Sequence, residues 1–155
     1  AGRWKSQPET FDFRPGIPER TEAAQAEVSG GEMDMTLRHN RLQKELFDNL
    51  SRQFGVENVG VEVPSGNGGK IDLVVRKEGP RWIFCEIKAG RSAKSCIRDA
   101  IGQLLEYSLW PGATRPEKMV VVGEQEMSSE GEQYLEKLNT RFPLPLEYRH
   151  VSPDS

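Results

Sequence analysis

Two apolar segments separated by only three residues constrain the fold of this chain most strongly. They are Lys70–Lys77 (KIDLVVRK) and Arg81–Ala89 (RWIFCEIKA), with Glu78-Gly79-Pro80 between them. Valine, isoleucine and aromatic residues favour strands, whereas Gly and Pro favour a turn. Because so short a connection makes the second strand run back along the first, the sequence predicts an antiparallel hairpin.

Helices and strands are predicted on both sides of this hairpin. Leucines recur at helical spacing between Thr36, which can cap a helix, and Gly55, which can end one, so residues 36–55 are predicted to be helical. The other predicted elements are strands over 56–65, 118–124 and 144–151 and helices over 95–110 and 128–142. The order α-β-β-β-α-β-α-β indicates an α/β domain.

The first part of the chain differs from the rest in its pattern. Residues 1–35 contain three prolines and a glycine pair and show no sustained period, so they are predicted to form a partly irregular N-terminal extension. Residues 36–155 are predicted to be one domain, since the chain is too short for two. Trp4, Phe11 and Phe13 could anchor the extension to this domain or to a partner, and docking onto the domain is expected.

Composition limits the class of protein. No run approaches the roughly 20 apolar residues of a membrane span, and the N-terminus has no basic-then-apolar signal, so a cytoplasmic protein without a membrane partner is expected. Two cysteines form neither a disulfide framework nor a zinc site and are predicted to be free thiols. The chain begins at Ala1 rather than Met, which is compatible with a piece of a longer multidomain protein.

Charged residues within the two hairpin strands need an explanation. Side chains alternate between the faces of a strand, so Glu86 and Lys88 point the same way, and Asp72 lies in a run apolar enough for burial. One interpretation is a buried or edge ion pair that holds the hairpin together. The other is that Asp72 and Glu86 hold a divalent cation on oxygen ligands while Lys88 lies beside an attacking water, which is an arrangement for phosphodiester hydrolysis.

The spacing of Asp72, followed after 13 residues by Glu86-Ile87-Lys88, resembles the PD-(D/E)xK nuclease superfamily over about residues 37–124. The resemblance implies a restriction-endonuclease-like α/β fold with an αβββαβ core, a central mixed sheet flanked by helices, and here a further C-terminal αβ unit. It implies Mg²⁺, with Mn²⁺ as a substitute, held by Asp72, Glu86 and the Ile87 carbonyl. Lys88 would orient or deprotonate the attacking water.

The sequence GQLLEY adds a second feature. Gln103 and Tyr107 are four residues apart on the predicted helix that follows the hairpin, so they are neighbours on its surface. Taken alone, the pair would close the seam between helix and sheet. The spacing is also similar to the QxxxY motif of the RecB-like branch of the superfamily, which implies that Gln103 and Tyr107 position Lys88, the substrate strand or both.

The first predicted helix departs from the superfamily pattern. Its members usually add an acidic residue from this helix, but here Gln43 lies at the centre of the apolar face and is matched to that acid as a metal ligand. Glu45, the alternative, falls about 135° away and is expected in solvent. His39, one turn before Gln43, is expected to be a core histidine bonded to backbone rather than a metal ligand, and a phosphate contact is a third option.

Basic residues gather near the predicted site although the net charge of the protein is −3. Between Arg81 and Arg98 there are five basic residues and one acid. Arg91, Lys94 and Arg98 are therefore predicted to bind nucleic acid, the alternative being a solvated loop.

These features together predict a magnesium-dependent nuclease, of a restriction, repair or defence type, that acts on DNA, with RNA left open as a substrate. A homodimer is expected if both strands of a duplex are cut. The main alternative is a catalytically inactive nuclease-fold domain that binds nucleic acid or a protein partner, which Gln43 favours. An unrelated α/β domain with an internal ion pair is the third interpretation.

Overall fold

The computed structural model describes residues 10–18 and 30–152, with side chains of the second range described from Asp34 onward. The elements are α1 (Gly30–Phe54), the short 3-10 helix η2 (Val56–Asn58), β1 (Val59–Pro64), β2 (Lys70–Lys77), β3 (Arg81–Lys88), α2 (Ala93–Leu109), β4 (Lys118–Gly123), α3 (Ser129–Arg141) and β5 (Leu146–His150). Every predicted helix and strand is present, with ends that shift by a few residues except at the start of α1.

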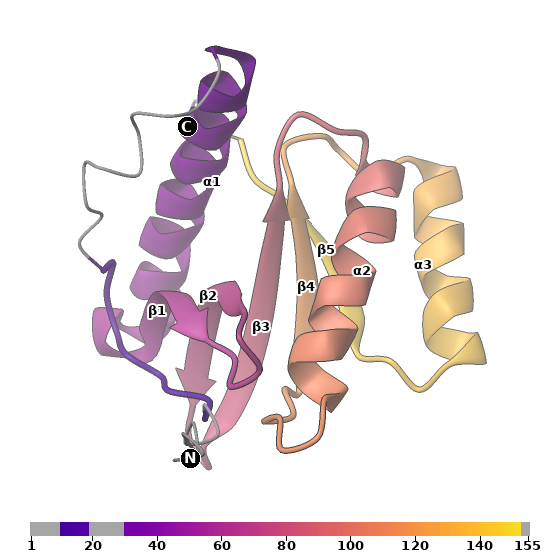
Figure 1. Cartoon of the computed structure of the whole chain (residues 1–155). Coiled ribbons are helices and arrows are strands. Elements are labelled where there is room, and N and C mark those ends of the chain that lie inside the picture. Colours follow the sequence, from indigo (N-terminus) through magenta and orange to yellow (C-terminus); the bar gives the residue numbers. More distant parts are fainter. Residues whose placement is uncertain (1–9, 19–29, 153–155) are drawn as a thin grey trace, which may run out of the picture.

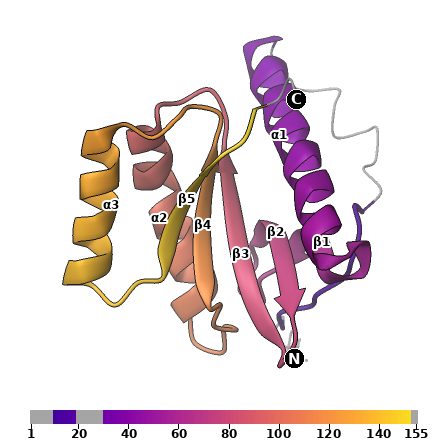
Figure 2. The ribbon, with the colours of Figure 1, turned by 180° about the vertical axis from the view of Figure 1, so that it is seen from behind.

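The strands form one mixed sheet in the order β1-β2-β3-β4-β5. β1, β2 and β3 are an antiparallel meander, whereas β3, β4 and β5 are parallel because α2 and α3 carry the chain back between them. Helix α1 covers one face of the sheet, and α2 and α3 cover the other (Figure 1 and Figure 2). The predicted αβββαβ core, with its central mixed sheet and C-terminal αβ unit, is confirmed.

Two cores lie on the two faces of the sheet. Ile83, Cys85 and Ile87 of β3 pack toward α1, and Phe84 packs toward α2, as the alternation of side chains along a strand requires. Both cysteines are buried free thiols, as predicted. None of the helices in the described part of the chain is both long enough and apolar enough to cross a bilayer.

Helix α1 begins at Gly30, six residues before the predicted start, so part of the predicted extension is helical. The sequence pattern missed this start, and the described positions from Asp34 to Arg38 are all exposed, so they add no apolar stripe. Glu and Met are good helix formers, which is compatible with this earlier start.

The segment 10–18 lies along the edge of β1. A bridge joins Gly16 to Gly60, and Gly16 N–H donates to the Val59 carbonyl at 2.9 Å. A side chain at Gly60 would come within 2.3 Å of the Arg14 carbonyl oxygen, so only glycine permits this approach. The segment thereby covers an otherwise open sheet edge.

Aromatic side chains hold the same segment against the sheet. The rings of Phe11 and Phe13 lie 4.9 and 5.2 Å from the ring of Trp82, and Phe11 also lies 5.7 Å from Phe84. The expected docking of Phe11 and Phe13 onto the domain is confirmed, whereas Trp4 lies outside the described residues.

Candidate active site

Asp72 links β2 to β3 at the point where the backbone ladder between them ends. The last backbone pair of this ladder is Leu73 with Cys85. One residue further, Asp72 Oδ2 accepts a hydrogen bond from the Ile87 N–H at 2.8 Å. A carboxylate therefore takes the place of a main-chain acceptor, and this bond holds Asp72 beside Glu86 on the neighbouring strand.

Glu86 is an acid in an environment that opposes its charge. The residue is 3% exposed, and its Oε2 has no hydrogen-bond partner within the described part of the chain. Burial raises the pKa of Glu86 to about 9, and the charge of Asp72 contributes in the same direction while Lys88 opposes the shift. A buried carboxylate with one oxygen that has no partner in the described chain, beside a second carboxylate, is stabilised by taking up either a proton or a cation.

Lys88 is held between this acid and helix α2. Its Nζ donates to Gln103 Oε1 at 2.5 Å and lies 3.9 Å from Glu86 Oε1. The predicted placement of Glu86 and Lys88 on one face of β3 is thus confirmed. Because the four-carbon side chain of a lysine is flexible, these two partners define where the amine lies.

Tyr107 continues the chain of contacts from Lys88 through Gln103. It forms a hydrogen bond with Gln103, and burial together with the charges of Glu86 and Asp72 raises its pKa well above the ordinary value, so the phenol stays neutral. A side chain at Gly69 would come within 2.9 Å of the Tyr107 ring. Tyr107 therefore packs tightly on the turn that begins β2.

Helix α1 contributes Gln43 and His39, each of which contacts Asp72. Gln43 is 2% exposed and its Nε2 donates to the Asp72 main-chain carbonyl at 2.9 Å, so its amide nitrogen fixes the backbone of β2. His39 Nε2 lies 3.2 Å from Asp72 Oδ2, which corrects the expectation of a core histidine bonded to backbone. Burial opposes the charged form of His39, but its bond to Asp72 and the charge of that carboxylate raise its pKa overall.

Two glutamates differ from what the sequence pattern indicates. Glu45 is half-buried rather than in solvent, and it does not line the pocket described below. Glu62 of β1, which the sequence analysis did not single out, lies in that pocket, and its charge also favours the protonated form of His39 by raising its pKa. The available signal was an acid among the valines of a predicted strand, the same signal that pointed to Asp72.

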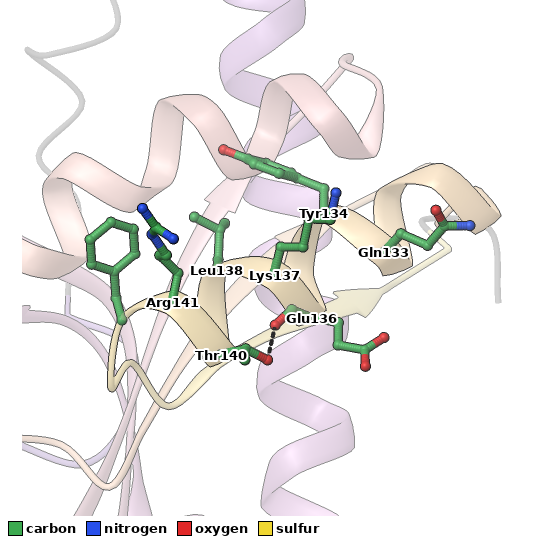
Figure 3. A pocket seen from close by; sticks show the side chains of 8 residues that line it. Gln133, Tyr134, Glu136, Lys137, Leu138, Thr140 and Arg141 are labelled. Carbon is green, nitrogen blue, oxygen red and sulfur yellow. Dashed lines mark hydrogen bonds between the residues drawn. The ribbon is translucent and has the colours of Figure 1, made fainter.

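A pocket of about 420 Å³ collects these residues from α1, β1, β2, β3 and the loop after β3. Its lining is Met35, Thr36, His39, Asn40, Glu62, Asp72, Glu86, Ile87, Lys88, Ala89 and Arg91. Another pocket, of about 960 Å³, lies along α3 and includes Tyr134 and Arg141, but none of the residues of the predicted site (Figure 3). The larger of these two pockets therefore lies apart from the residues of the predicted site.

The side chains that line the pocket do not form a complete metal cage. Across the described residues, no group of three or more His, Cys, Asp or Glu side chains has the arrangement needed to hold a metal ion. The ligands available for direct contact are the carboxylates of Asp72 and Glu86 and main-chain oxygen. This donor set suits Mg²⁺, which is commonly bound by one or two carboxylates and keeps several waters.

The predicted basic residues are divided between two places. Arg91 lines the pocket of Asp72 and Glu86, and its guanidinium pairs with Asp99 of α2. Lys94 and Arg98 instead line a separate pocket of about 360 Å³ together with Tyr134 of α3. The structure thus brings one of the three basic residues to the acidic site and the other two to the seam between α2 and α3.

Comparisons with known proteins add little to this geometry. No protein-family model matches the chain, and no curated protein matches it significantly. Among solved structures, the chain is similar to one described as a repair endonuclease from Pyrococcus abyssi, with 17% sequence identity and a TM-score of 0.41. The match covers 72% of this chain and 47% of that protein, so this chain spans about half of its length.

Proposed function

We propose that this protein is a magnesium-dependent nuclease that hydrolyses phosphodiester bonds in DNA. The observation that carries the proposal is the buried Glu86 Oε2, which has no partner among the described residues and lies beside Asp72, with the Lys88 amine on the same face of β3. An internal ion pair does not by itself account for such an oxygen, because buried acceptors are usually hydrogen-bonded.

Asp72, Glu86 and the Ile87 carbonyl would hold Mg²⁺, or Mn²⁺ in its place. The cation would supply Lewis-acid stabilisation of the charge that develops on the phosphate oxygens. A cation would also relieve the repulsion between the two carboxylates, which together with burial raises the pKa of Glu86.

Lys88 would orient or deprotonate the attacking water from its position between Glu86 and Gln103. Gln103 and Tyr107 would act as positioning residues, since Gln103 accepts the hydrogen bond of Lys88 and Tyr107 packs α2 against the start of β2.

The basic residues would contact the backbone of the nucleic acid. Arg91 would contact a phosphate near the site, and Lys94 and Arg98 would contact a phosphate farther along the nucleic-acid strand. A homodimer would be a natural arrangement if both strands of a duplex are cut.

To test this function, the protein is incubated with plasmid, linear duplex, single-stranded DNA and RNA, each in the presence of Mg²⁺, Mn²⁺ or EDTA. We expect that DNA is cleaved only when a divalent ion is present. Asp72→Asn, Glu86→Gln and Lys88→Ala should each reduce the cleavage rate by a factor of about 10² or more. These variants should melt as cooperatively as the parent. Glu117→Gln, at an ion pair with Lys77 away from the pocket, is the matched control and should cleave normally.

One observation favours a catalytically inactive domain that binds nucleic acid or a protein. Gln43 stands where nucleases of the superfamily usually have an acid, and its amide is occupied by the Asp72 backbone. Binding of nucleic acid without cleavage in any metal would support that alternative. If the protein neither binds nor cleaves nucleic acid, and the Asp72 and Glu86 variants unfold, the result would support an internal ion pair with a structural role.

A further inference from the structure

Glu62 has a backbone conformation that side chains rarely adopt. Its φ is +53°, and among the described residues no other non-glycine has a positive φ. It lies in the middle of β1, where an extended conformation would be expected. Such conformations reduce stability and persist where the surrounding structure requires them, most often at functional sites.

The register of the sheet places Glu62 opposite Asp72. The flanking pairs of β1 and β2 are Val61 with Leu73 and Val63 with Ile71, and no residue is inserted between them. Val61 and Leu73 belong to the core under α1, whereas Val63 and Ile71 belong to the core under α2. Residues two apart normally share a face, so both strands change face at the Glu62–Asp72 position.

This change of face brings a third acid to the pocket. Glu62 lines it together with His39, Asp72 and Glu86, from a strand that supplies no other residue to the lining. The geometry does not make Glu62 a direct partner of the other acids around an ion, since no three acidic, His or Cys side chains of the described chain have metal-ligand spacing. Any role of Glu62 at a cation would therefore run through water molecules.

We propose that Glu62 is a positioning residue of the cation site, which accepts hydrogen bonds from the water molecules that Mg²⁺ keeps when Asp72 and Glu86 bind it. The inference rests on the proposed function. Mg²⁺ gives up its waters reluctantly, so acceptors for those waters orient the ion and raise its affinity. Glu62 would supply from β1 the negative charge that Gln43 does not supply from α1.

Two variants separate this role from a structural one. Glu62→Gln removes the charge at nearly constant size, and Glu62→Gly removes the charge and also permits the positive φ without strain. Glu57→Gln, an exposed glutamate of η2 outside the pocket, is the control. Calorimetric titration with Mg²⁺ and thermal melts in EDTA are measured for all three variants, for Asp72→Asn and for the parent, followed by cleavage at a series of Mg²⁺ concentrations.

We expect both Glu62 variants to lose about 10- to 100-fold in Mg²⁺ affinity and to need correspondingly more Mg²⁺ for cleavage. In EDTA, Glu62→Gly should melt above Glu62→Gln, because both variants lose the charge and only glycine relieves the strain of the positive φ. Unchanged Mg²⁺ affinity in both variants, or a Glu62→Gly variant that melts below Glu62→Gln, would overturn the role of Glu62. If the parent itself binds no Mg²⁺ and cleaves nothing, the proposed function fails, which is a different result.

Discussion

At the scale of single residues, the surroundings of each acid determine its chemistry. Asp72 accepts hydrogen bonds from the Ile87 N–H and lies beside His39, so its charge is satisfied. Glu86, only one strand away, is buried with an oxygen that has no partner in the described chain. The two acids therefore lie in different surroundings, Asp72 with hydrogen-bond partners for its carboxylate and Glu86 with one buried oxygen that has none in the described chain.

The pH dependence of stability should report this state of Glu86. Its pKa is 4.5 in a model peptide and about 9 in the folded, metal-free protein, so the folded protein binds more protons than the unfolded chain between these values. The free energy of unfolding should then fall as pH rises through this window. Urea unfolding in EDTA measures it, and Glu86→Gln should flatten the slope. Equal slopes in parent and variant would show that Glu86 is ionised throughout.

Gln43→Glu tests whether the amide of Gln43 is structural. A carboxylate cannot donate to the Asp72 carbonyl, which would lose its bond of 2.9 Å, and it would face the other acids. We expect the metal-free protein to lose about 1–3 kcal/mol of unfolding free energy, with part of this recovered in Mg²⁺. Glu45→Gln, outside the pocket, should change stability by less than about 0.5 kcal/mol. A silent Gln43→Glu would contradict the role assigned to the amide.

At the scale of elements, the sheet is completed by a segment that is neither helix nor strand. Residues 10–18 pair with β1 at Gly60 and place Phe11 and Phe13 on Trp82, over the end of the α2-side core. Irregular chain can cover a sheet edge in this way because its backbone groups bond to the edge strand and its aromatic side chains bury apolar area.

Gly60→Ala should detach this segment without changing its sequence. The added Cβ would meet the Arg14 carbonyl at 2.3 Å, and a backbone oxygen cannot move aside unless the segment moves with it. We expect a loss of about 1–3 kcal/mol of stability and faster proteolysis within residues 10–18. Gly102→Ala, on the open side of α2, is the control and should stabilise the helix by about 1 kcal/mol. Unchanged proteolysis of Gly60→Ala would show that the segment is held elsewhere.

At the scale of the whole molecule, the site exists because the sheet stops being regular between β2 and β3. Helix α1 supplies His39 and Gln43, β1 supplies Glu62, and α2 supplies the Gln103 that holds Lys88. These residues meet at the end of the β2–β3 ladder, where the Asp72 side chain replaces a main-chain acceptor for the Ile87 N–H. A gap in the ladder is therefore the structural origin of the pocket.

The sequence by itself determined the elements, their order and the central acids. Period-2 and period-3.6 patterns depend on which faces are buried, and they were clear wherever an element packs on the sheet. The patterns did not predict the helix over Gly30–Met35, where the described side chains, Asp34 and Met35, are exposed. Asp72, Glu86 and Lys88 stood out because a charge in a buried strand is costly and needs a reason.

Only the tertiary structure decided the partners of these residues. Strand register and helix packing bring His39 to Asp72 and cause the change of face at Glu62. They also place Arg91 in a different pocket from Lys94 and Arg98. No local pattern encodes such distances, because they arise between residues that are far apart in the chain and meet only when the two cores have formed.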